Sequence, residues 1–254
     1  MENATGSIDG EKTSVNHWNG AWASSPRMRL PSGLNVSTLN LQRLLKRYVY
    51  PGAQFLEIGF APGKILAWTG KVLGAQVAGL DYSPPGCEWA RKLFWKLGIS
   101  GDLRCENAFA TSFERDKFDI VFSAGVIEHF DDPKGIVDVH VRLVKPGGRA
   151  IMAVPNFAGL RGRLLKLIDP ASVPLHNLSI MSRDNLMGLV PKDMKLTARA
   201  YVTGRLSLWH YGVGKLRRKG AAKAFLWGVN LVGVMQPCDL TVLCPLMVLE
   251  IVKD

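Results

Sequence analysis

Apolar residues between about 50 and 156 follow two alternating patterns along the chain. Short apolar runs that end in small or polar residues predict strands at 55–58, at 76–81, at 103–106, within 118–130 and at 150–154. Apolar residues at helical spacing predict helices that contain Leu41, Leu44, Leu45 and Tyr48; Trp89, Ala90, Leu93, Phe94 and Leu97; and Ile136, Val137, His140 and Val141. Strands and helices therefore alternate. This predicts a parallel sheet covered on both faces, with a ligand at the carboxyl ends of its strands.

The stretch 55–64 runs from an apolar strand into a turn of small residues that opens a helix. Gly59 and Gly63 have no Cβ and Ala61 has only a methyl group, so a ligand can lie close to the backbone here. A dinucleotide fingerprint needs a small residue at position 64, but this chain has Lys64, which disfavours a nicotinamide oxidoreductase. Asp81 ends the next predicted strand, 22 residues after Gly59, where a ribose-binding carboxylate is expected.

The same order of motifs continues along the chain. Asn107-Ala108 follows the third predicted strand, Glu128-His129-Phe130 leaves the fourth, and Lys145-Pro146-Gly147-Gly148 precedes the fifth. Together with the E-x-G-x-A-x-G turn at 57–63, this series resembles the class I S-adenosylmethionine (SAM)-dependent methyltransferases, especially the branch with ubiquinone-pathway O-methyltransferases and many small-molecule and glycan methyltransferases. The resemblance covers about 50–156 well and the rest loosely. It implies a Rossmann-like α/β fold with a doubly wound, mostly parallel seven-stranded sheet and a helical insertion after strand five.

The resemblance also implies that SAM is the cofactor. Glu57 would orient its methionine amino group, the turn would pass under it, Asp81 would bind both ribose hydroxyls, and Asn107 with Ala108 would border the adenine. The expected cofactor-binding residues are Glu57, Gly59, Ala61, Gly63, Asp81, Asn107, Ala108 and Ser123. The chain departs from the family pattern at Ala61, where glycine is commoner, and at Asn107, which replaces an Asp but can still accept a hydrogen bond from the adenine amino group.

For a hydroxyl acceptor the chemistry needs a base, and histidine titrates near neutral pH. His129 and His176 are the candidates, although His129 could equally cap or pack, and Glu128 is a weaker one. The other histidines have less claim: His17, His140 and His210. Four residues before the first core helix are expected to close over the site: Trp18, Trp22, Arg27 and Arg29. Packing alone is an equal explanation for the two tryptophans.

Composition fits one domain. The 254 residues are 47% hydrophobic, enough to bury a full core. We expect a disordered tail at 1–16 and one domain at 17–254, with its core at about 50–156 and its substrate or lid region at about 157–254. The polar, acidic N-terminus and the lack of an 18-residue apolar run favour a cytoplasmic protein. Four cysteines without C-x-x-C spacing favour reduced thiols, and no metal site is expected.

The formal net charge of +11 raises the question of an anionic partner. Nucleic acid is disfavoured, because the chain lacks both the (N/D)-P-P-aromatic tetrapeptide and the Pro-Cys nucleophile of base methyltransferases after strand four. Two stretches, 160–168 and 215–229, interleave Lys and Arg with Leu, Phe and Trp in the manner of helices that lie on anionic membranes. The alternative is that their apolar faces pack on the domain. The first stretch also lies where the family inserts its substrate-covering segment.

The sequence therefore predicts transfer of the SAM methyl group to a small-molecule acceptor, most simply a hydroxyl of a metabolite or of a lipid-linked or glycan-type compound. Two alternatives remain open at this stage. One is an RNA or protein methyltransferase, and the other is a SAM-binding, membrane-associated module that has lost turnover. The cytoplasm, with peripheral membrane contact, is the expected location.

Overall fold

The computed structural model describes residues 10–24, 27–207, 220–237, 239 and 244–254. Its α-helices are α1 Val15–Ala21, α2 Val36–Leu45, α3 Lys64–Leu73, α4 Pro84–Leu97, α5 Lys134–Leu143, α6 Leu160–Ile168, α7 Arg183–Met187 and α8 Gly220–Met235. Short 3-10 helices are η1 Ala108–Ala110, η2 Ile127–His129, η3 Pro170–Leu175 and η4 Leu178–Ile180. The strands are β1 Gln54–Ile58, β2 Gln76–Asp81, β3 Asp102–Cys105, β4 Phe118–Ala124, β5 Val144–Pro155, β6 Leu196–Thr203 and β7 Leu246–Lys253.

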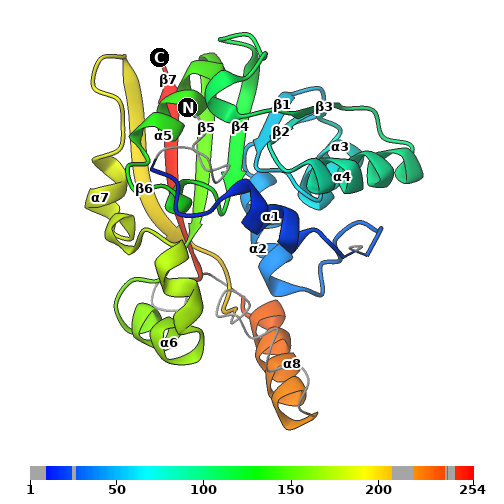
Figure 1. The fold of residues 1–254 in the computed structure, drawn as a ribbon, viewed down its shortest axis with the longest axis vertical. Coiled ribbons are helices and arrows are strands. Elements are labelled where there is room, and N and C mark those ends of the chain that lie inside the picture. The colour runs from blue at the N-terminus through cyan, green and yellow to red at the C-terminus, as the bar shows by residue number, and fades with distance from the viewer. Residues whose placement is uncertain (1–9, 25–26, 208–219, 238, 240–243) are drawn as a thin grey trace.

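The seven strands form one sheet in the order β3-β2-β1-β4-β5-β7-β6 (Figure 1). The first five strands along the chain pair in parallel, whereas β7 runs antiparallel to both β5 and β6. The strand order reverses between β1 and β4, and this is where open α/β sheets bind ligands. The expected doubly wound, mostly parallel sheet of seven strands, with a helical insertion after β5, is confirmed.

Alternate residues of the central strands feed two separate cores, one on each face of the sheet. Leu56 and Val121 pack with α5, α6 and α7 on one face. Phe55 and Phe122 pack with α2, α3 and α4 on the other. Because successive side chains of a strand point to opposite faces, consecutive apolar residues such as 120–122 of β4 are what a sheet covered on both sides requires.

Strand limits differ from the pattern at two places. β4 stops at Ala124 because Gly125 has φ of 76° and the chain turns into η2, so the apolar residues after it are not strand. β5 starts earlier than expected, at Val144, and carries Gly147 and Gly148 within it.

The expectation of a disordered tail through residue 16 is wrong for residues 10–16. Backbone hydrogen bonds join Lys12 N to His129 O (2.7 Å) and Asp131 N to Gly10 O (2.7 Å), and Thr13 is buried. These long-range bonds, which no local pattern signals, fix the segment that leads into α1.

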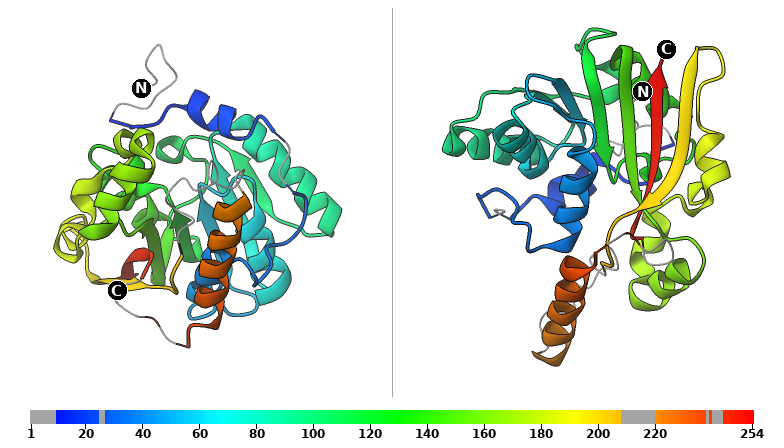
Figure 2. Two further views of the ribbon diagram at one scale, coloured as in Figure 1. Left: turned by 90° about the horizontal axis from the view of Figure 1, so that it is seen from below. Right: turned by 180° about the vertical axis from the view of Figure 1, so that it is seen from behind.

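Helices α6 and α8 project from the end of the molecule at which the parallel strands finish (Figures 1 and 2). The C-terminal half of α8 is anchored to α2, because Asn230 Oδ1 accepts from Val36 N (3.0 Å) and Asn230 Nδ2 donates to Leu34 O (2.6 Å). Within the part of the chain that the structure describes, none of the helices is long and apolar enough to cross a bilayer. Of the predicted 215–229 stretch, residues 215–219 lie outside the described residues.

Candidate active site

The turn after β1 depends on two glycines in the left-handed region. Gly59 has φ of 74° and Gly63, which caps α3, has φ of 84°. A Cβ on Gly59 would lie 2.5 Å from Cγ2 of Val126, a residue of the segment that follows β4. Glycine is therefore required here for two reasons, the backbone conformation and the close approach of a neighbouring side chain.

Asp81 fixes this turn to the end of β2. Its Oδ2 accepts a hydrogen bond from Ala61 N (3.0 Å), and its Oδ1 accepts one from Ser83 N (2.9 Å). Burial raises the pKa of Asp81, and the backbone N–H groups act in the opposite direction by stabilising the charge. Each carboxylate oxygen has further acceptor capacity beyond the one bond described. The carboxylate can therefore hold the turn and bind a diol at the same time.

A cavity of about 300 Å³ opens at the carboxyl ends of β1, β2 and β4. Gly59, Ala61 and Asp81 form one wall, and the segment 106–109 forms another. Residues 124–126 and 129–130, at and after the end of β4, close the far side. An acidic acceptor beside a bare backbone turn, next to the partly exposed Phe109 ring, suits a ribose with an attached aromatic base. The residues present thus fit a nucleoside such as the adenosine part of SAM.

Five of the eight expected cofactor residues line this cavity: Gly59, Ala61, Asp81, Asn107 and Ala108. Glu57, Gly63 and Ser123 are not among its lining residues. Ser123 faces the opposite direction, where its hydroxyl lies 2.9 Å from Nε2 of the buried His140 on α5. Its proposed contact with the cofactor is therefore wrong for the side chain, because strand alternation directs it towards α5 and leaves Ala124 at the cavity.

Glu57 lies behind the turn. It is 5% exposed, and among the described residues its Oε2 has no hydrogen-bond partner. Burial raises the pKa of Glu57 well above its ordinary value, and the nearby Asp81 charge raises it further.

Asn107 lines the cavity but already uses one acceptor site. Its Oδ1 accepts from Phe109 N (2.9 Å) and so caps η1. This bond orients the loop that carries Ala108 and Phe109, and it leaves the side-chain NH₂ group and one oxygen lone pair for a ligand.

The N-terminal segment covers the site. Trp18 and Trp22 line the cavity, as does Glu11, whose Oε1 accepts a 2.5 Å hydrogen bond from the Tyr82 hydroxyl. Closure by the two tryptophans was one of two readings of the sequence, and the structure places both at the cavity. Sequence reasoning missed Glu11 and Tyr82. Tyr82 follows Asp81 directly and could have been suspected, whereas Glu11 lies in the stretch expected to be disordered.

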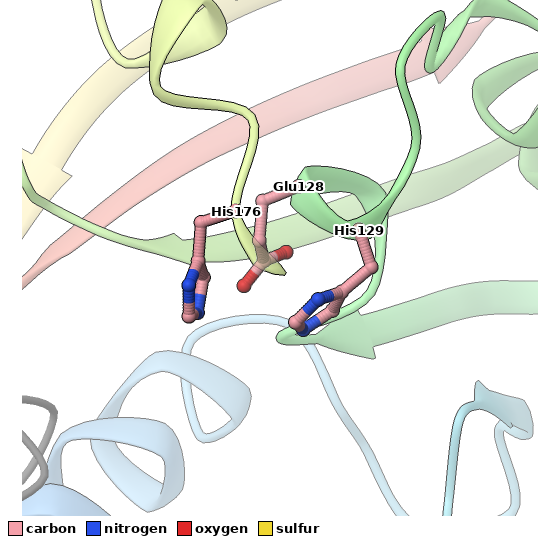
Figure 3. A group of neighbouring side chains, drawn as sticks. All are labelled: Glu128, His129 and His176. Atoms are coloured by element: carbon pink, nitrogen blue, oxygen red, sulfur yellow. The ribbon is translucent and has the colours of Figure 1, made fainter. Parts of the chain in front are cut away.

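His129 and His176 meet at one end of the cavity, beside Glu128 (Figure 3). Their ring centroids are 5.0 Å apart, and the Glu128 carboxylate lies between the two imidazoles. His129 lines the cavity and packs edge-on against Trp18 at 5.1 Å, whereas His176 stands behind it against Phe157. Both candidate bases therefore belong to one cluster, which we call the Glu128–His129–His176 cluster.

Burial keeps this cluster uncharged near neutral pH. It lowers the pKa of His129 to about 4, with a further contribution from the charge of His176, and it also lowers the pKa of His176. Burial raises the pKa of Glu128 to about 8. Two imidazole nitrogens and a carboxyl oxygen are also the donor types that transition metals bind.

Asn177 joins the insertion to η2. Its backbone N donates to Glu128 O (2.6 Å), and its Nδ2 donates to Phe130 O (3.0 Å) and Asp131 O (2.9 Å). These bonds bring His176 to His129, which is 47 residues away in the sequence.

Comparisons with known proteins agree with the fold. Residues 56–152 match the family model of a methyltransferase domain. A ubiquinone biosynthesis O-methyltransferase of Chelativorans sp. (strain BNC1) is 34% identical over 107 residues, which are 42% of each chain. One from Methylocella silvestris is 37% identical over 105 residues, 41% of each chain. The chain thus spans about two fifths of the length of these curated relatives.

Solved structures extend the likeness beyond the matched segment. Geranyl diphosphate C-methyltransferase from Streptomyces coelicolor A3(2), in complex with S-adenosyl-L-homocysteine, superposes with a TM-score of 0.56 at 16% identity over 84% of this chain and 78% of that chain. Identity this low shows the shared fold alone. With the domain match, the sheet order and the glycine turn held by Asp81, residues 56–152 form a methyltransferase domain of the class I SAM-dependent type.

Proposed function

We propose that the protein transfers the methyl group of SAM to a hydroxyl oxygen of a small molecule. One observation carries the choice of acceptor. A neutral imidazole, His129, stands in the wall of the cavity that Asp81 also lines. Its Nδ1 lies 2.7 Å from Leu175 O, so Nδ1 carries the hydrogen and Nε2 keeps the lone pair.

At the cofactor end, the chain's own residues bind SAM and orient it. Asp81 accepts hydrogen bonds from the ribose hydroxyls, Gly59 and Ala61 let the ligand approach the backbone, and Asn107 with Phe109 borders the adenine. When bound, SAM supplies an electrophilic methyl group on a sulfonium. Glu57 is not among the lining residues, so its interaction with the methionine part would pass through the turn or through water.

At the acceptor end, the Glu128–His129–His176 cluster binds the hydroxyl group of the acceptor. Trp18 and the segment around Glu11 exclude water from the cavity, which strengthens polar interactions inside it. The matched relatives are named as ubiquinone biosynthesis O-methyltransferases, and this supports oxygen as the methylated atom. A protein or RNA acceptor has less support, because the N-terminal segment covers the site.

The test is methyl transfer from isotope-labelled SAM to a panel of phenols, glycosides and prenyl-linked alcohols, each with its O-methylated counterpart as a control. We expect product with the free hydroxyl only, and loss of product in His129→Gln with SAM affinity retained. A labelled methyl group found on a nitrogen or carbon atom of the product would contradict the proposal. So would a His129→Gln variant with unchanged turnover.

We further propose that the protein works in the cytoplasm on an anionic membrane surface, through α6 and α8. Phe225 and Trp227 on α8 are 64% and 68% exposed, and Leu167 on α6 is 80% exposed. Exposed Arg163 and Lys166 accompany them on α6. Apolar side chains beside cations at one end of the molecule match the chemistry of an anionic lipid surface. A lipid-soluble or lipid-linked acceptor would then reach the insertion directly.

Flotation with vesicles of graded anionic lipid content tests this location. We expect recovery with the vesicles to rise with anionic lipid and to fall with salt, and to fall in a Trp227→Ser variant. Trp95→Ser is the matched control, since Trp95 is 87% exposed and its helix, α4, lies away from α6 and α8 (Figure 1). Equal recovery of the wild-type protein at every lipid composition would refute membrane docking.

A further inference from the structure

We propose that Glu128, His129 and His176 form a binding site for a divalent cation of the Zn²⁺ type. One ring nitrogen of each histidine and one carboxylate oxygen lie within 4.8 Å of one another. Among the described residues, these three are the group of His, Cys, Asp or Glu side chains that could hold a metal ion. The cysteine spacing predicts no zinc site, and this site uses none of the cysteines.

Both histidines are already held as metal ligands usually are. His129 Nδ1 donates to Leu175 O (2.7 Å) and His176 Nδ1 donates to Ser172 O (2.7 Å). A metal-binding histidine typically donates its second ring N–H to a carbonyl or carboxylate, which fixes the tautomer and the ring orientation. The free lone pair of each imidazole is then on Nε2, the atom that would bind the cation.

Glu128 provides an independent observation. It is fully buried, and neither carboxylate oxygen accepts a hydrogen bond from another residue in the part of the chain described. A buried polar group without a partner costs free energy, so such groups in proteins are normally hydrogen-bonded, paired or bound to a metal. The carboxylate lies between the two imidazoles (Figure 3), where a cation would satisfy all three side chains at once.

The geometry needs only local adjustment. Ligand atoms of a tetrahedral Zn²⁺ site with bonds of about 2.0–2.1 Å are about 3.4 Å apart. The spacing here is within 4.8 Å, so rotation of the side chains suffices. The backbone is fixed beforehand by the Asn177 bonds to Glu128 O, Phe130 O and Asp131 O. Two imidazoles favour Zn²⁺ or a similar transition metal over Mg²⁺, which prefers oxygen ligands.

Three protein ligands leave a fourth position open, as in catalytic zinc sites. Because His129 lines the cavity, that position opens towards it. The nature of the fourth ligand, the acceptor hydroxyl, rests on the proposed function, whereas cation binding does not. A cation bound there would lower the pKa of a hydroxyl that it coordinates.

The experiment uses the full chain, stripped with a chelator and then equilibrated with Zn²⁺ or with Mg²⁺ alone, with no SAM or acceptor present. Bound metal is measured by elemental analysis after equilibrium dialysis. The variants are Glu128→Gln and His176→Gln, which keep the side-chain size. His17→Gln is the matched control, because His17 is exposed, packs on Trp18 and is not one of the three side chains that would bind the cation.

We expect one Zn²⁺ per wild-type chain at micromolar concentration, little Mg²⁺, and at least about tenfold weaker Zn²⁺ binding in Glu128→Gln and His176→Gln but not in His17→Gln. Co²⁺ in place of Zn²⁺ should give visible absorption without the near-ultraviolet thiolate band. Zn²⁺ binding that is absent, or equal in all four proteins, would overturn the site. SAM affinity, measured separately on the same protein preparations, shows whether a variant is folded. Loss of methyl transfer with Zn²⁺ binding intact would count against the proposed function instead.

Discussion

Replacement of Asp81 by asparagine tests the cofactor end of the cavity most directly. Asparagine has the same shape, but it has only one oxygen, and an NH₂ group replaces the other. In the structure, Oδ2 accepts from Ala61 N and Oδ1 accepts from Ser83 N. Whichever way the amide turns, one backbone N–H loses its acceptor and meets a donor.

The expected losses of SAM affinity and of folding stability follow from these hydrogen bonds. A hydrogen bond to a charged group contributes about 1.5–3 kcal/mol. Loss of the charged acceptor for the ribose therefore weakens SAM binding by about 10- to 150-fold, since each 1.4 kcal/mol is about a factor of ten. The unpaired backbone N–H adds about 1–3 kcal/mol of lost folding stability, because Asp81 is half-buried and water cannot fully replace it.

Calorimetric titration with SAM and with S-adenosyl-L-homocysteine measures the first effect, and urea unfolding measures the second. Asp102→Asn is the control. Asp102 is the first residue of the edge strand β3, and its carboxylate pairs with Arg104 at the surface. A folded Asp81→Asn variant that binds SAM within about twofold of the wild type would refute the assignment of Asp81 to the ribose.

Two further changes test the fold around the site. Gly59→Ala should abolish SAM binding, and it should reduce the free energy of unfolding by more than Gly52→Ala does. Both glycines have positive φ, but only a Cβ at position 59 would meet Val126. Equal losses of the two variants in urea unfolding would show that the contact with Val126 costs nothing. His140→Asn should flatten the acid dependence of stability. Burial lowers the pKa of His140 to about 4 in the folded state, so the unfolded chain binds the proton at a higher pH, and stability falls by up to about 3 kcal/mol as pH drops from about 6.5 to about 4. Urea midpoints measured at several pH values check this, and a slope equal to that of the wild type would contradict it, although the lost bond to Ser123 should lower stability at every pH.

The cofactor end could be read from the sequence because its parts are local. The turn at 57–63 and the strand that ends at Asp81 are each a few residues long, and parallel strands bring their carboxyl ends to one edge of the sheet. What the pattern left undetermined was the direction of single side chains. Ser123 lies at the correct strand end, but it shares a face with Val121 and so points to His140.

The acceptor end could be predicted only in part, because it is made by contacts between distant segments. His129 and His176 were each recognisable as candidate bases, yet nothing in the sequence places them together. That depends on Asn177, whose side chain reaches two backbone carbonyls after Glu128-His129. Glu11 and Thr13 have the same character, since their segment is ordered by backbone bonds to residues 129–131 and not by any apolar period of its own.

The cofactor turn and the N-terminal segment differ in how easily they can open. The cofactor turn is part of the sheet and its cores, so it is formed before any ligand arrives. Helix α1 has no buried residues, and it is held over the cavity mainly by side-chain contacts such as Trp18 with His129 and Asn19 with Ser83. The residues before it are held more firmly, by backbone bonds to residues 129–131. Segments with little buried apolar surface open locally at low free-energy cost. We therefore expect α1, rather than the backbone-bonded residues before it, to be the part of this wall that moves when SAM enters. Because its Trp18 packs on His129, its return would close the cofactor end and order the acceptor end in one step.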